Sequence, residues 1–195
     1  MWRLDEDVHR LLALCREREI PCEDLAGLPL KRQRECAAER LLLCHAMGQP
    51  VRCAHDVHGA PLIEDVEVNV SITHTPRLVA VAISDDTVIG IDAEQEDRHQ
   101  VLRVRDKFLN ASEKQFIDAD DLMAHVIAWT AKEAIIKAER NSALDWTDGI
   151  TLEPFAHMGE EDAMILRATC GNRHYTLECR QLEGHRITVS RPVNA

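Results

Sequence analysis

The chain has 195 residues, of which 45% are apolar and 29% charged, as in an ordinary globular protein. Its net charge of −11 and its aromatic content of only 4% argue against a general role in binding nucleic acid or an anionic membrane. Seven cysteines without a Cys-x-x-Cys pair favour reduced thiols, and no apolar run near the N-terminus resembles a signal peptide or a membrane span. A cytoplasmic protein is therefore expected.

The predicted elements begin with a helix over residues 31–47, where helix formers precede the stop signals Gly48 and Pro50. Strands are expected at 66–72 and 78–83, and Asp85 with Asp86 predicts a hairpin turn that leads into a third strand ending at Asp92. The second half repeats this order, with a long predicted helix and then four predicted strands. These lie at 121–140 and at 150–155, 163–169, 175–182 and 186–190.

The repeated order predicts the fold class. AAERLLL at 37–43 can be aligned with TAKEAII at 130–136, and no long linker separates the halves. We therefore expect an α+β protein that is a pseudo-duplicate of two halves, 1–97 and 98–195. Each half is a helix packed on an antiparallel meander, and the cleft between them is the natural place for a ligand. Two similar halves in one chain favour a monomer.

Three short motifs contain residues that can perform chemistry. Asp92 and Glu94 leave a strand at positions i and i+2, which suits a hard cation such as Mg²⁺, although such pairs also occur on solvated strand edges. Glu133 and Lys137 share one helix side with Trp129, and Lys132 lies one turn after Trp129; alone, this pattern indicates a surface ion pair. His74 ends an alternating strand, where imidazole is usually structural but can bind phosphate.

Taken together, SITH, VIGIDAE, FLNASE and WTAKEAIIK, in this order, resemble the 4′-phosphopantetheinyl transferase superfamily. The length and the similar halves resemble its monomeric, pseudo-dimeric group, the type that activates surfactin synthetase. The resemblance implies Mg²⁺-dependent transfer of 4′-phosphopantetheine from coenzyme A to a serine of an apo acyl or peptidyl carrier protein, with release of 3′,5′-ADP. No nucleic acid or membrane partner is implied.

The resemblance also implies roles for single residues. Asp92, Glu94 and Glu133 match the metal-binding carboxylates, and Glu133 also matches the residue that helps to deprotonate the serine. Lys137 would donate to the diphosphate or to the leaving oxygen, and Lys132 would hold phosphate as a point charge. Glu113 matches a carboxylate with a supporting role, and the alternative is that it only caps or orients its neighbours.

Coenzyme A would be bound by Arg32, Thr73, His74, Asp92, Lys132 and Lys137. Arg32 belongs to KRQRE, which matches a basic helix entry that contacts the 3′-phosphate, although a solvated helix face would look the same. Thr73 stands where the family often has Ser and keeps the hydroxyl. Ala60 replaces a phosphate-binding Lys, so coenzyme A affinity is expected to be lower, or to be supplied by Arg52 or the Arg32 region.

A docking segment for the carrier protein is expected at 98–109, where basic and apolar residues alternate; its candidate contacts are Arg98, Val101, Leu102 and Arg105. The alternative is an ordinary amphipathic connector. Two other functions fit the same residues: a non-catalytic protein that binds coenzyme A or carrier protein, and a phosphohydrolase that uses water in place of the serine.

Overall fold

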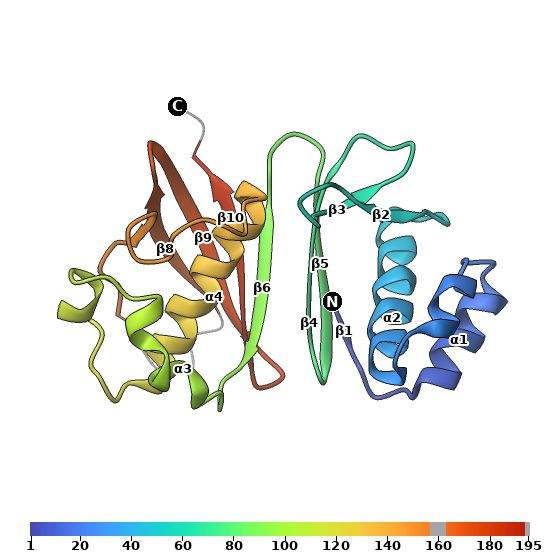
Figure 1. The fold of residues 1–195 in the computed structure, drawn as a ribbon, viewed down its shortest axis with the longest axis horizontal. Coiled ribbons are helices and arrows are strands. Elements are labelled where there is room, and N and C mark those ends of the chain that lie inside the picture. Colours follow the sequence, from blue (N-terminus) through green and yellow to red (C-terminus); the bar gives the residue numbers. More distant parts are fainter. Residues whose placement is uncertain (157–162, 194–195) are drawn as a thin grey trace. The chain divides into compact units, whose positions relative to one another are not determined.

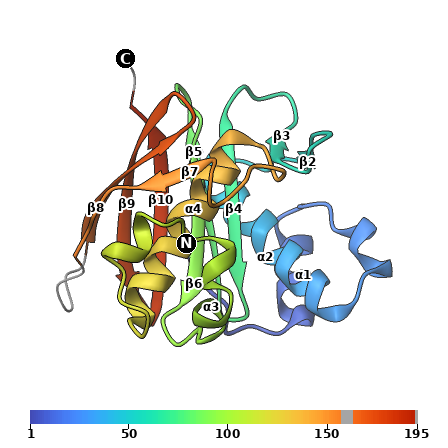
Figure 2. The ribbon, with the colours of Figure 1, turned by 60° about the vertical axis from the view of Figure 1, so that its left-hand side comes forward.

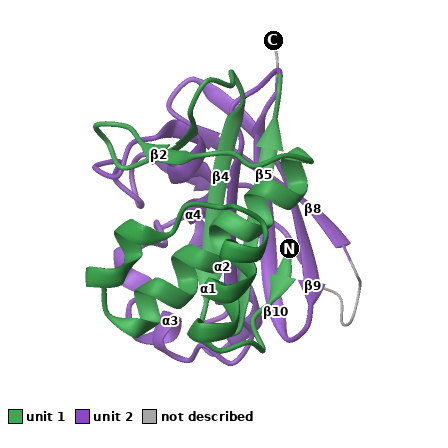
Figure 3. Cartoon of the chain, turned by 90° about the vertical axis from the view of Figure 1, so that its right-hand side faces the viewer, with its two compact units in different colours: residues 1–85 green, residues 86–195 purple. Residues whose placement is uncertain are grey.

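The computed structural model describes residues 1–156 and 163–193, which form two compact units, Met1–Asp85 and Asp86–Ala195 (Figure 3). The division falls earlier than the expected boundary at residues 97 and 98, so Asp92 and Glu94 belong to the second unit together with Glu133. The architecture is α+β with antiparallel sheets, in agreement with the predicted class. In the described part of the chain, no helix is long and apolar enough to cross a membrane.

In unit 1 the helix Leu30–Met47 packs on one small sheet, and the helix Val8–Glu17 packs on that helix. Strand order in this sheet is β1-β5-β4, and a separate hairpin is formed by β2 and β3. The long helix of unit 1 begins after Pro29 and ends at Gly48, whose φ of 68° is the left-handed conformation that glycine adopts freely. In chain order (Figure 1) the elements are β1 (Trp2–Arg3), α1 (Val8–Glu17), η1 (Glu23–Gly27), α2 (Leu30–Met47), β2 (Cys53–His55), β3 (Pro61–Ile63), β4 (Asn69–Thr75) and β5 (Leu78–Ser84).

Unit 2 is a five-stranded antiparallel sheet, in the order β6-β10-β9-β8-β7, with one long helix packed on one of its faces (Figure 2). That helix is capped by the Asp121 carboxylate, which accepts from the Ala124 amide at 3.0 Å. The elements are β6 (Gly90–Gln95), α3 (Gln100–Arg103), η2 (Arg105–Lys107), η3 (Glu113–Gln115), α4 (Leu122–Glu139), β7 (Ile150–Leu152), β8 (Ala163–Cys170), β9 (Arg173–Leu182) and β10 (His185–Pro192).

Both predicted long helices are confirmed, as α2 and α4, and so is the predicted strand that became β5. The strand predicted at 66–72 is present as β4, but it begins at Asn69, because the Val68 amide donates to the Val66 carbonyl and makes a tight turn there. One strand prediction was wrong. The segment ending at Asp92 is not the third strand of an N-terminal meander, since β6 pairs with β10 along residues 90–95.

Candidate active site

The candidate site is built on the contact between α4 and the β6 edge of its sheet. Two hydroxyls of β10 fix the helix there: Ser190 Oγ donates to the Ala134 carbonyl at 2.8 Å, and the hydroxyls of Thr188 and Thr130 lie 2.8 Å apart. Gly90 lets the strand approach closely, because a Cβ at this position would lie 2.9 Å from the Ala138 amide nitrogen. Helix and strand backbones therefore meet beside Asp92.

One stripe of α4 remains partly accessible. Twelve of its 18 residues are buried, so the helix is enclosed on almost every side. Between Ala124 and Ala138, the residues that are not fully buried are Trp129, Glu133 and Lys137, at i, i+4 and i+8. The sequence placed these three side chains on one helix side, and the structure adds that this side is the accessible one.

The two central motifs meet through Lys137 and Asp92, which lie 45 positions apart in the sequence. The Lys137 ammonium donates to Asp92 Oδ1 at 2.8 Å and to the Ile91 carbonyl at 3.0 Å. Asp92 is 6% exposed, and the Lys137 side chain is 29% exposed. An ammonium group has three hydrogens, so one donor remains beyond these two contacts. The lysine can therefore hold Asp92 and still reach an anion.

Glu133 and Glu94 complete the predicted carboxylate set. Burial and the negative charge of Asp92 raise the pKa of Glu133, while Lys137 and Arg98 oppose that rise. Glu94 forms an ion pair with Arg98, whose guanidinium lies 5.2 Å from the centre of the Trp129 ring. Cationic side chains thus partner the carboxylates on both sides of the site.

The donor set fits a hard divalent cation, although the three carboxylates are not gathered around one point. Across residues 1–156 and 163–193, no three His, Cys, Asp or Glu side chains are grouped closely enough to hold a metal ion. Asp92 is nevertheless near enough to shift the pKa of Glu133, and oxygen ligands are those that Mg²⁺ prefers. A cation bound between Asp92 and Glu133 would relieve the repulsion between their carboxylates.

Lys132 does not occupy the position that the sequence suggested. Its side chain is fully buried, and its ammonium lies 2.7–3.0 Å from four oxygen atoms. These belong to the Glu113 carboxylate and to the carbonyls of Phe108, Trp146 and Ile150. With all three hydrogens engaged, no donor is left for phosphate, so the prediction that Lys132 binds coenzyme A was wrong.

Glu113 has a definite supporting place. It is fully buried, and one carboxylate oxygen accepts from Lys132 and from the Asn110 amide at 2.8 Å, while the other accepts from the Leu152 amide at 2.8 Å. It therefore joins η3, α4 and β7.

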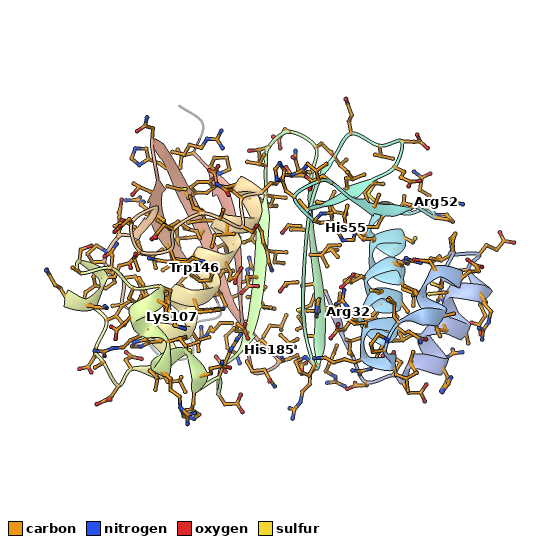
Figure 4. All side chains as sticks on the ribbon, viewed as in Figure 1. Arg32, Arg52, His55, Lys107, Trp146 and His185 are labelled. Atoms are coloured by element: carbon orange, nitrogen blue, oxygen red, sulfur yellow. The ribbon has the colours of Figure 1, made fainter. Side chains whose placement is uncertain are left out.

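In unit 1, Arg32 and His74 are brought together although they lie 42 positions apart in the sequence (Arg32 is labelled in Figure 4). Arg32 Nη1 lies 3.4 Å from His74 Nε2 and 2.7 Å from the carboxylate of Glu35, which is only 4% exposed. His74 Nδ1 faces Glu39 at 3.1 Å. The sequence did not identify these two acids as partners of Arg32 and His74, the predicted phosphate contacts.

The other predicted unit 1 contact, Thr73, does not join this cluster. Thr73 is 4% exposed, and neighbouring strand residues point to opposite faces, so Thr73 does not share a face with His74. Two further basic residues of α2 serve the fold: Arg34 donates to the carbonyls of Leu4, Glu6 and Pro76, and Arg40 pairs with Asp24 at 2.6 Å.

The expected docking segment is short and only partly exposed. Val101 is 1% exposed and belongs to the core of unit 2, so its prediction as a surface contact was wrong. Leu102 and Arg105 are partly exposed, as is Arg98. Beneath the segment lies a cavity of about 440 Å³ that the sequence did not reveal. It is lined by Arg98, Gln100, Val101, Val104, Lys107, Phe108, Trp129 and Trp146 (Lys107 and Trp146 are labelled in Figure 4).

A buried helix that presents a carboxylate and a lysine beside the acidic end of a strand is a candidate site for an anionic ligand and a cation. The comparison with family models then gives the class of protein. Residues 88–190 match the family described as the 4′-phosphopantetheinyl transferase superfamily, and the chain belongs to it. Membership implies phosphopantetheine transfer to carrier proteins in general. A search of curated proteins found no match.

Proposed function

We propose that this protein is a Mg²⁺-dependent transferase of the pseudo-dimeric type. It moves 4′-phosphopantetheine from coenzyme A to a serine of an apo acyl or peptidyl carrier protein and releases 3′,5′-ADP. The observation that carries the proposal is the 2.8 Å contact between Lys137 and Asp92, which joins the two family motifs within the matched region.

Asp92, Glu94 and Glu133 would hold the metal ion. When bound, Mg²⁺ neutralises charge on the coenzyme A diphosphate and on the leaving phosphate oxygen. Glu133 accepts the proton of the carrier serine, directly or through water, as its raised pKa allows. The serine oxygen then bonds to the phosphorus that carries pantetheine, and the bond from that phosphorus to the bridging oxygen breaks.

Lys137 stabilises the charge that appears on the leaving side. Its third hydrogen is directed to a diphosphate oxygen, while its contacts with Asp92 and the Ile91 carbonyl fix its position. In unit 1, Arg32 supplies positive charge and His74 a ring N–H for the 3′-phosphate, and both contact Glu35. Arg98, Leu102 and Arg105 supply the basic and apolar contacts for the acidic helix of the carrier protein.

The test is a panel of apo carrier proteins incubated with the protein, coenzyme A and Mg²⁺, read by intact mass. We expect the phosphopantetheine mass on at least one carrier, and its loss in Asp92→Ala with the folded state retained. Coenzyme A binding without product across the panel would instead support a non-catalytic relative. Release of 3′,5′-ADP without a carrier would support a phosphohydrolase.

A further inference from the structure

Lys132 and Glu113 form a fully enclosed ion pair at the junction of four chain segments. The ammonium and carboxylate are 2.7 Å apart, and neither side chain has any exposed surface. A buried pair of this kind gains little over an apolar pair unless its remaining hydrogen-bonding groups are also satisfied. Here they are, since Lys132 also donates to three carbonyls and Glu113 also accepts from two amides.

Two of these carbonyls belong to walls of the 440 Å³ cavity. Lys132 holds the backbones of Phe108 and Trp146, each with a 2.7 Å hydrogen bond. Trp129, another aromatic residue that lines the cavity, lies on α4 one turn before Lys132. The rings contact one another: Phe108 meets Trp129 edge-on with centroids 5.2 Å apart, and Trp129 and Trp146 have centroids 4.7 Å apart.

Lys132 also precedes Glu133 directly in the sequence. On one helix turn, the buried face is therefore fixed by Lys132 and the accessible face carries the candidate base. The Lys132–Glu113 pair thus links the cavity walls to the helix turn that presents Glu133. The Lys132 ammonium has no hydrogen left to donate to a ligand.

We propose that Lys132, paired with Glu113, is a positioning residue for the transfer reaction. Lys132 fixes the Phe108 and Trp146 walls of the cavity against the turn of α4 that carries Glu133. It does not bind phosphate. The proposal rests on the proposed function for its kinetic consequence and on the contacts of unit 2 for its geometry. It separates two lysines of one motif, assigning phosphate to Lys137 and cavity shape to Lys132.

The test compares Lys132→Met with Lys137→Met, and uses Lys114→Met as the matched control. Lys114 is a partly exposed lysine next to Glu113 that pairs with Asp106. Three quantities are measured where circular dichroism shows each variant folded. They are the dissociation constant of 3′,5′-ADP, kcat/KM for transfer, and the near-ultraviolet circular dichroism of the tryptophans.

For Lys132→Met we expect 3′,5′-ADP affinity within twofold of wild type, a fall in kcat/KM of at least tenfold, and loss of the dichroism from the Trp129–Trp146 contact. Lys137→Met should weaken 3′,5′-ADP binding at least tenfold and keep that dichroism, and Lys114→Met should change none of the three. Weakened 3′,5′-ADP binding in Lys132→Met, or unchanged kcat/KM, would overturn the proposal.

If Lys132→Met does not fold, Glu113→Gln carries the test, since it keeps the volume but removes one of the acceptors, and the same pattern is expected. Failure of the proposed function is recognised separately. In that case the wild-type protein neither transfers phosphopantetheine nor binds 3′,5′-ADP, while the tryptophan signal still reports whether Lys132 fixes the cavity walls.

Discussion

Replacing Gly90 with alanine tests whether the close approach of β6 to α4 creates the site. The added Cβ would lie 2.8 Å from the Ala134 carbonyl carbon, which is 0.6 Å short of the 3.4 Å at which ordinary contact begins, and it would lie closer still to the carbonyl oxygen. These atoms are backbone, and Ser190 already holds the same carbonyl, so the helix cannot yield by moving one side chain. The strand must move away from the helix.

A displacement of that size is enough to disrupt the site. Lys137 donates to Asp92 Oδ1 at 2.8 Å and to the Ile91 carbonyl at 3.0 Å. If the strand moves away by 0.6 Å or more, both distances lengthen toward or past the upper limit for a hydrogen bond. Overpacking of this kind costs roughly 1–3 kcal/mol. For a protein of this size each kcal/mol lowers Tm by about 2–4 °C.

We therefore expect Gly90→Ala to lower Tm by roughly 2–12 °C and to reduce transfer at least tenfold while the protein is still folded. Thermal unfolding and the intact-mass transfer assay measure the two effects. Gly27→Ala is the matched control, because a Cβ at Gly27 meets no atom within 4 Å. Wild-type stability and activity in Gly90→Ala would refute the claim that the β6 and α4 backbones determine the Asp92 and Lys137 geometry.

Three further predictions concern charges. Glu133→Gln should stabilise the metal-free protein at pH 7. The pKa of Glu133 is raised in the folded protein, so ionisation of this carboxyl destabilises the fold as the pH rises above 4.5, the ordinary pKa of a glutamate. Urea unfolding in chelator should show this gain shrinking as the pH falls toward 4.5, and a less stable variant at pH 7 would contradict the sign. Arg98→Gln should bind Mg²⁺ more tightly by calorimetry, because Glu94 loses its competing partner, and unchanged affinity would count against that competition. Glu35→Gln should raise the KM for coenzyme A and lower the free energy of unfolding, measured in urea, by about 1–3 kcal/mol, because it weakens a buried acceptor of charged hydrogen bonds. An unchanged KM would show that Glu35 does not support the phosphate contacts.

The long helices could be predicted because their signals are local. Gly48 ends α2 and the Asp121 carboxylate caps α4, and both features are readable in a window of a few residues. Strand partners are not encoded in such a window. The run that ends at Asp92 fits either sheet by pattern alone, and its partner β10 lies about ninety residues further along the chain.

The grouping of Glu133 with Lys137 followed from helix spacing, whereas the contact with Asp92 needed the packing of α4 on β6. The burial of Lys132 left a signal in the sequence. Its helical neighbours Ala128, Ile135 and Ile136 are apolar, and all three are buried with it. A lysine among such neighbours needs an internal partner. That partner, Glu113, is nineteen positions away, and helix spacing alone could not identify it.

The contrast between the two lysines of α4 gives a physical criterion for dividing roles within a short motif. Both are cations in the same helix. The Lys132 ammonium donates all three hydrogens to protein oxygens and has no exposed surface, whereas the Lys137 ammonium retains one hydrogen at a partly exposed position. An anion can bind only where a donor and an approach both remain. The accessible stripe of Trp129, Glu133 and Lys137 meets that condition, so a ligand that reaches α4 between Ala124 and Ala138 must do so along this stripe.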